Sequence, residues 1–180
     1  MKNKIRLLII GLLCMVLIGL GGCGGAGEGG DTDSGPKIAT IRINADIKNL
    51  DPARRYTRWD DMVAAPVFSG LITYAPNSYE IQKDLAEEFE ISEDGKEIYF
   101  KLKEGAQFYN GHGEVTAEDV KYSYERFLDS DVDSAYKDDW AKLDHVEVLG
   151  KYEGKIILTD SFAPLMTTTL PLNSGSIVPK

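Results

Sequence analysis

The chain has 180 residues, 29 of them acidic and 20 basic, which gives a formal net charge of −9 at pH 7. This balance argues against a nucleic-acid-binding protein, because such proteins present a basic surface to the phosphate backbone. It also argues against broad electrostatic attachment to anionic lipid.

The first residues predict an export signal. Lys2, Lys4 and Arg6 precede an almost wholly apolar run from Leu7 to Leu20, which is the layout of a secretory signal peptide. The run is shorter than the roughly 20 residues that a membrane-spanning helix needs.

Cys23 is the candidate lipidation site. Leu20-Gly21-Gly22-Cys23 resembles the bacterial lipobox, in which the cysteine thiol receives diacylglyceryl chains. The resemblance implies a lipoprotein signal peptide over residues 1–22 and a lipid anchor on the extracytoplasmic face of the cell membrane, since two or more acyl chains anchor a protein stably. An ordinary signal peptide with a chance cysteine is the alternative.

The residues after the cysteine predict a tether. Residues 23–36 comprise Cys23 and a Gly-rich stretch without large apolar side chains, which is typical of a flexible linker. Cys14 lies in the segment to be removed, so a mature chain lipidated on Cys23 has no disulfide available. The folded part, residues 37–180, must therefore be stabilised by burial, and its length is sufficient for one domain.

The next segments predict a strand and a helix. Residues 37–44 alternate between apolar and polar side chains, which favours a strand with one buried face. Leu50-Asp51-Pro52 ends this element, because proline cannot join a strand ladder. Residues 58–68 favour a helix. Pro66 lies near its C-terminal end, so the sequence does not define where the helix ends.

Two hairpins and one capped helix are predicted further along the chain. Residues 87–91 and 97–103 are strands joined by a turn at Asp94-Gly95. Thr116 is the predicted N-cap of a helix with acidic residues in its first turn. Residues 144–149 and 155–159 form a second hairpin, turning at residues 152–154. This order predicts an α/β fold of α+β character.

The sequence contains no recognisable catalytic or metal-binding motif. His112 and His145 are far apart, with no cysteine or second histidine beside either of them, so we expect no zinc site. We expect the acidic pairs Asp60-Asp61 and Asp138-Asp139 to lie on solvated faces. No nucleophile elbow or phosphate-binding loop is present, so we predict no enzyme, no metal and no cofactor.

Taken together and in order, several segments resemble the bacterial extracytoplasmic solute-binding proteins of family 5. These are the oligopeptide- and dipeptide-binding lipoproteins of ABC importers. The segments are Asn49-Leu50-Asp51-Pro52-Ala53, Val67-Phe68-Ser69-Gly70-Leu71-Ile72, the run from Asp84 to Lys96, Tyr99 to Gly105, Val115 to Val120, Ala163-Pro164-Leu165 and Ile177-Val178-Pro179-Lys180.

The resemblance implies a partial type II periplasmic-binding-protein-like fold. Residues 37–50, with the first strand of lobe I, and residues 174–180 belong to the main lobe. Residues 51–173 form an inserted N-terminal subdomain. Family members are far longer, so we expect this chain to correspond to their N-terminal part.

The resemblance also implies a ligand and partners. In peptide-binding members the ligand lies extended and pairs with protein backbone as an added strand. Asn44, Ala45, Asp46, Ile47 and Lys48 occupy the family position that contributes such contacts, and Asp46 is a candidate partner of the peptide amine. The alternative for this stretch is a polar strand end approaching a turn.

The predicted partners are a peptide or other small solute, an ABC permease complex and, through Cys23, the membrane. Two alternatives remain for the function of the chain. One is a truncated product that is not competent in transport, and the other is a surface lipoprotein used for protein contact.

Overall fold

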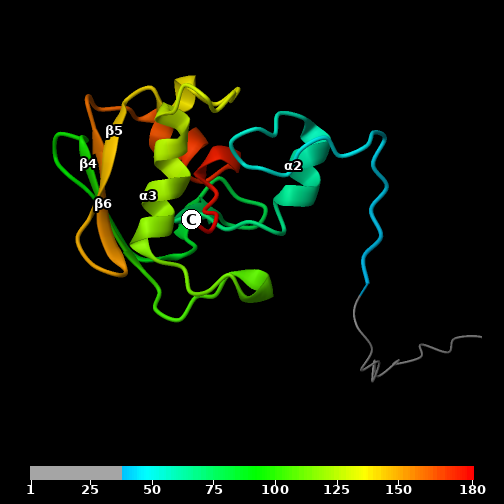
Figure 1. Ribbon diagram of the computed structural model, residues 1–180, viewed down its shortest axis with the longest axis horizontal. Helices are drawn as coiled ribbons and strands as arrows, with labels where there is room; N and C mark the ends of the chain where they lie inside the picture. The colour runs from blue at the N-terminus through cyan, green and yellow to red at the C-terminus, as the bar shows by residue number, and fades with distance from the viewer. Residues whose placement is uncertain (1–37) are drawn as a thin grey trace, which may run out of the picture. The chain divides into compact units, whose positions relative to one another are not determined.

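The computed structural model describes residues 38–180 (Figure 1). The predicted signal peptide, the lipidation site Cys23 and the tether lie outside the described residues. The chain divides after Ile41, and the helices and strands of the described residues all lie in the unit Arg42–Lys180.

The strand predicted over residues 37–44 is not formed in residues 38–44. These residues lack regular secondary structure, and all of them are exposed except the half-buried Ile43. Alternation alone does not make a strand, because a strand requires hydrogen bonds to a neighbouring strand. Within the described residues, no strand pairs with this stretch. The prediction of a first strand at this place is therefore wrong for the chain as described.

The main element is an antiparallel sheet. Within the described residues it contains four strands in the order β3-β4-β6-β5. Their bounds are Ala86–Ile91 for β3, Glu97–Leu102 for β4, Leu143–Val148 for β5 and Glu153–Leu158 for β6. Both predicted hairpins are confirmed, and their two inner strands, β4 and β6, pair with each other at the centre of the sheet.

The two hairpin turns differ in how well the sequence predicts them. Gly95 has a φ of +69° in the β3–β4 turn, a left-handed conformation that favours glycine, as expected for Asp94-Gly95. The predicted turn at residues 152–154 is placed too late, because β6 already begins at Glu153. The chain turns between Val148 and Glu153 instead, with the N–H of Leu149 bonded to the Glu153 carbonyl at 2.9 Å.

Helix α3, Ala117–Glu125, packs against the sheet at β5. Its predicted N-cap is confirmed: the backbone N–H and the hydroxyl of Thr116 both donate to the Asp119 carboxylate, at 2.8 and 2.7 Å. Apolar side chains of the helix, of the inward faces of the strands and of the connection that precedes β5 form the core. The fully buried members include Ile98, Phe100, Leu102, Val120, Tyr124, Trp140, Val146 and Ile156.

A second, smaller region precedes the sheet in the chain. It contains helix α2, Arg58–Ala64, and the antiparallel pair β1, Ile72–Tyr74, and β2, Ile81–Lys83. The predicted helix over residues 58–68 is confirmed in position but ends earlier, at Ala64. This mixture of helices and antiparallel strands confirms the predicted α+β character.

The last residues run back through the centre of the body and lie beside α3 (Figure 1). Ser176 forms an isolated antiparallel bridge with Gly70, and the N–H of Ile177 donates to the Ser69 carbonyl at 2.9 Å. The Tyr124 hydroxyl of α3 donates to the Gly175 carbonyl at 3.1 Å. None of the helices in residues 38–180 has the length and hydropathy that crossing a membrane requires.

Candidate ligand-binding site

The predicted ligand-contacting residues form one exposed, irregular segment. Residues 44–48 are exposed apart from Ile47, which is half-buried, and residues 42–47 line an open depression. Within the described residues, no hydrogen bond joins residues 44–47 to another backbone group. Their N–H and C=O groups are therefore available to an extended ligand, as strand addition requires.

The carboxylate of Asp60 holds the end of this segment. Its Oδ1 accepts hydrogen bonds from the backbone N–H of Lys48 at 2.7 Å and of Asn49 at 3.4 Å. Asp60 is fully buried in the first turn of α2, where its own N–H donates to the Thr57 hydroxyl at 3.1 Å. Burial by itself would raise the pKa of Asp60. The hydrogen bonds together outweigh burial and lower the pKa below its ordinary value, and the bond from Lys48 has the largest effect among them.

The turn that follows the segment is fixed to α3. Asp51 accepts the Ala53 N–H at 3.0 Å, and its other carboxylate oxygen pairs with the guanidinium of Arg126 at the end of α3. Burial opposes ionisation of Asp51, but the Arg126 hydrogen bond and charge outweigh burial and lower the pKa of the carboxyl. The segment therefore enters the body at a position set by both helices.

A buried arginine connects this region to the last residues of the chain. Arg55 is 1% exposed and donates through Nη2 to the Asn173 carbonyl at 2.8 Å and to the Ser176 hydroxyl at 3.1 Å. Its Nε lies 3.3 Å from Asp61 Oδ1, and its guanidinium lies over the ring of Phe68 at 5.3 Å. These contacts explain how a charged side chain is kept in the interior.

This polar cluster was not predicted from the sequence. The solvated face predicted for Asp60-Asp61 is wrong for Asp60, which is fully buried, while Asp61 is half-buried against Arg55. The local signal was Thr57, three residues before Asp60, which caps α2 and directs its first turn inward. The partners Lys48 and Asn173 are distant in sequence, so no local pattern indicates them.

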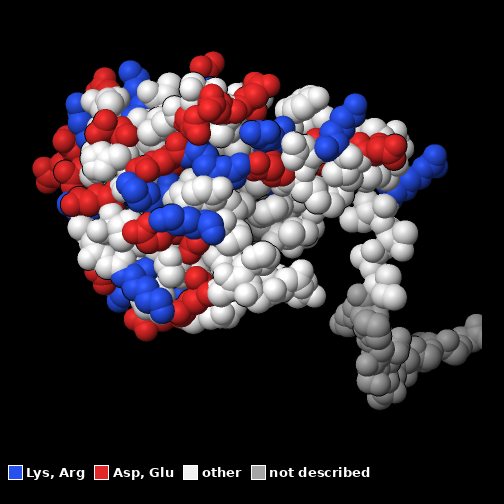
Figure 2. Space-filling model, in the orientation of Figure 1, with Lys and Arg blue, Asp and Glu red and all other residues white. Residues whose placement is uncertain are grey.

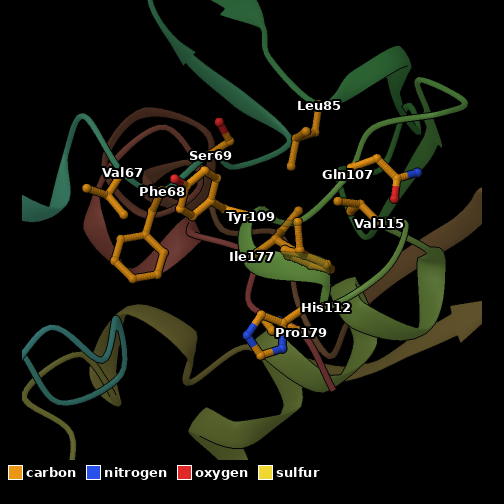
Figure 3. Close-up of a pocket in the computed structure, with 11 residues that line it drawn as sticks. Val67, Phe68, Ser69, Leu85, Gln107, Tyr109, His112, Val115, Ile177 and Pro179 are labelled. Atoms are coloured by element: carbon orange, nitrogen blue, oxygen red, sulfur yellow. The ribbon is translucent and has the colours of Figure 1, made fainter.

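A separate apolar pocket of about 360 Å³ lies between four segments of the chain (Figure 3). Its lining residues come from the stretch after α2, from the connection between β2 and β3, from the loop between β4 and α3, and from the last residues. They are Val67, Phe68, Ser69, Leu85, Gln107, Phe108, Tyr109, His112, Val115, Ile177 and Pro179. Figure 3 shows His112 beside Pro179 at one border, with Leu85 at the opposite side.

The two histidines lie in different parts of the body. His112 belongs to the pocket border, whereas His145 is on β5 with its Nδ1 at 2.8 Å from Asp144 Oδ2. Within residues 38–180, no three histidine, cysteine or acidic residues are grouped as metal ligands would be.

Charged side chains of both signs are mixed over the visible face of the body (Figure 2). On the outer face of the sheet, Lys155 pairs with Glu97 at 2.8 Å, and Lys101 lies 3.5 Å from both Glu87 and Glu88. Such mixed pairs keep a surface soluble without creating a field of one sign.

Comparison with known proteins identifies the family. The model of the bacterial extracellular solute-binding proteins, family 5 Middle, matches residues 80–179. This chain belongs to family 5. The predicted family is thus confirmed over more than half of the chain.

Two curated relatives of this family 5 chain are binding proteins. The oligopeptide-binding protein OppA of Bacillus subtilis is 30% identical over 132 residues, which cover 73% of this chain and 24% of OppA. The probable D,D-dipeptide-binding periplasmic protein DdpA of Escherichia coli is 33% identical over 138 residues, covering 74% of this chain and 26% of DdpA. The chain therefore spans about a quarter of the length of each relative.

The fold of the family 5 chain also has solved counterparts. The binding protein MoaA from A. tumefaciens R10, in complex with mannopinic acid, superposes with a TM-score of 0.70 at 31% identity. The match covers 75% of this chain and 28% of MoaA. The predicted fold class, part of a periplasmic-binding-protein fold, is thereby confirmed.

Proposed function

We propose that this chain is the N-terminal part of a peptide-binding subunit of an ABC importer. Lipid on Cys23 anchors the subunit to the extracytoplasmic face of the cell membrane. The observation that carries the peptide assignment is the open main chain of residues 44–47, together with the names of the relatives OppA and DdpA. A backbone that pairs with backbone accepts many side chains, as a peptide importer requires.

A small organic acid is the second candidate ligand. MoaA, 31% identical to this chain, was solved with mannopinic acid. Exposed main-chain donors also bind a carboxylate, so the ligand class needs a direct test.

The test uses a photoreactive peptide. A tripeptide bearing a diazirine is irradiated with membranes that carry the natural gene product, and the protein is digested with trypsin. We expect the label in the tryptic fragment Ile43–Lys48, because trypsin cleaves after Arg42 and after Lys48.

Three unlabelled competitors make the result specific. Unlabelled trialanine should remove the label, whereas free alanine and mannopinic acid should not. Displacement by mannopinic acid alone would assign an organic acid instead, and labelling that no competitor reduces would refute solute binding. Displaceable labelling of another fragment would refute only the site at residues 44–48.

The domain division is also proposed. Residues 37–50 and 174–180 would belong to the main lobe and residues 51–173 to the inserted subdomain. The contacts of Arg55 with Asn173 and Ser176 support this division. They join the start of the proposed subdomain to its end, where the chain would pass between the subdomain and the main lobe.

The anchor is tested by two cysteine variants. Cys23→Ser should abolish incorporation of labelled palmitate and leave the precursor uncleaved, because the acceptor thiol is lost. Cys14→Ser is the matched control and should incorporate palmitate like the unchanged chain. Equal labelling of Cys23→Ser and the unchanged chain would rule out the lipid anchor.

A further inference from the structure

The stretch before Leu50 has one strong attachment to α2. Lys48 and Asn49 are 12 and 11 residues before Asp60, yet both of their N–H groups donate to the same carboxylate oxygen, at 2.7 and 3.4 Å. A bond between a backbone N–H and an ionised carboxylate is charge-assisted and about twice as strong as a neutral one. Asp60 is fully buried, so water competes little for these bonds.

The acceptor itself is held firmly. Thr57 caps the helix by accepting the Asp60 N–H at 3.1 Å, and the Asp61 N–H donates to the Thr57 carbonyl at 3.1 Å. Within the described residues, the second carboxylate oxygen of Asp60, Oδ2, has no hydrogen-bond partner. The charge of Asp60 is therefore directed mainly at the two amides of the incoming segment.

The segment beyond this attachment has little else to orient it. Residues 44–47 form no backbone hydrogen bond within the described part of the chain, and Lys48 is the first residue whose amide is fixed to the helical region. On the other side, the Asn49 side chain accepts the Asp51 N–H at 2.9 Å and continues the order into the turn. The direction in which residues 44–47 leave the body thus depends on the bond at Lys48.

We infer that Asp60 is the positioning residue of the candidate ligand-binding segment, setting the orientation of main-chain groups 44–47 from a helix that the ligand does not touch. This inference rests on the proposed function, which makes residues 44–48 the peptide-contacting segment. Main-chain recognition depends on the angle and spacing of several N–H and C=O groups at once. A carboxylate that fixes one end of this series of main-chain groups therefore controls the affinity for peptide without contacting the peptide.

The first measurement concerns the segment alone and needs no ligand. Amide hydrogen exchange is followed residue by residue in the full chain and in Asp60→Asn, which keeps the shape of the side chain and removes its charge. We expect exchange at Lys48 and Asn49 to become at least about tenfold faster, because a charge-assisted bond is weakened. Exchange in β4 should stay unchanged, which separates a local effect from general destabilisation.

Two further variants complete this measurement. Asp61→Asn is the matched control on the same helical turn, since its carboxylate faces Arg55 and not the segment. It should leave exchange at Lys48 and Asn49 unchanged. Asp60→Glu keeps the charge and should restore part of the protection that Asp60→Asn loses.

The second measurement concerns the ligand. The trialanine concentration that halves photolabelling of the Ile43–Lys48 fragment should rise at least several-fold in Asp60→Asn and recover in part in Asp60→Glu. Unchanged exchange at Lys48 and Asn49 in folded Asp60→Asn would overturn the inference and leave the proposed function standing. Faster exchange at Lys48 and Asn49 with unchanged peptide competition would also overturn the inference, because the bond to Asp60 would then be lost without any effect on affinity.

Discussion

At the scale of single residues, Gly154 in β6 is the position where the packing leaves no room for a side chain. It lies opposite Phe100 of β4, and a Cβ at this position would be 2.6 Å from Phe100 Cζ and 2.7 Å from the Glu147 carbonyl oxygen. Phe100 is fully buried in β4, and the Glu147 carbonyl belongs to the backbone of β5, which pairs with β6, so neither can move easily. We expect Gly154→Ala to lower the free energy of unfolding by about 1–3 kcal/mol, as measured by urea denaturation.

Gly150, in the connection between β5 and β6, provides the matched control. A Cβ at Gly150 would meet no atom within 4 Å. Gly150→Ala should therefore change the free energy of unfolding by less than about 0.5 kcal/mol. Equal effects of the two substitutions would contradict the register in which Gly154 faces Phe100.

At the scale of elements, the start of α3 shows how one carboxylate serves two parts of the chain. Asp119 Oδ2 accepts the N–H and the hydroxyl of Thr116, and Asp119 Oδ1 accepts the N–H of Lys180 at 3.0 Å. Asp119→Ala removes the helix cap and the attachment of the last residue together. We expect a loss of about 2 kcal/mol in the free energy of unfolding, measured by thermal denaturation followed by circular dichroism.

A variant of the neighbouring acid, Glu118, distinguishes the loss of this cap from the general effect of removing a negative charge. Glu118 is in the same turn and pairs with the Lys180 side chain at 3.0 Å, but this pair is exposed. Glu118→Ala should cost less than about 1 kcal/mol, because exposed ion pairs contribute little. If Glu118→Ala proved the more destabilising of the two, the capping role of Asp119 would be refuted.

The elements that the sequence predicted are those whose determinants are local. Asp94-Gly95 carries its own turn conformation, and Thr116 with Asp119 forms its own cap, so the β3–β4 hairpin and the start of α3 are confirmed. The strand predicted over residues 37–44 required a partner strand, which an alternating pattern does not supply. The strands β1 and β2 are three residues each, too short for a periodic pattern to be recognised.

The site follows the same division between local and distant contacts. The assignment of residues 44–48 as the ligand-binding segment stays a prediction that depends on the family resemblance. The attachment of Lys48 to Asp60 joins residues 12 positions apart, and that of Arg55 to Ser176 joins residues 121 positions apart. Only the folded chain shows such contacts, because local sequence patterns report on neighbours within a turn or a strand.

At the scale of the whole molecule, carboxylates spread over the body act together on stability against acid. Hydrogen bonds or nearby bases lower the pKa of each of them below the ordinary value in the folded chain. These residues are Asp51, Asp60, Asp94, Glu114 and Asp160. A lowered pKa means that the unfolded chain binds protons at a higher pH than the folded chain does. Their stabilising contribution is therefore complete above the ordinary pKa and is lost as the pH falls through the folded pKa.

We accordingly expect the free energy of unfolding to decrease as the pH falls below the ordinary values of 4.5 for Glu and 3.8 for Asp. Urea unfolding midpoints at a series of pH values measure this decrease. Glu114→Gln should make the decrease shallower, because Glu114 accepts bonds from Lys151 at 2.6 Å and from the Gly105 N–H at 2.7 Å that favour its ionised form. Stability that stayed constant or rose between pH 5 and pH 3 would show that these carboxylates are not preferentially ionised by the fold.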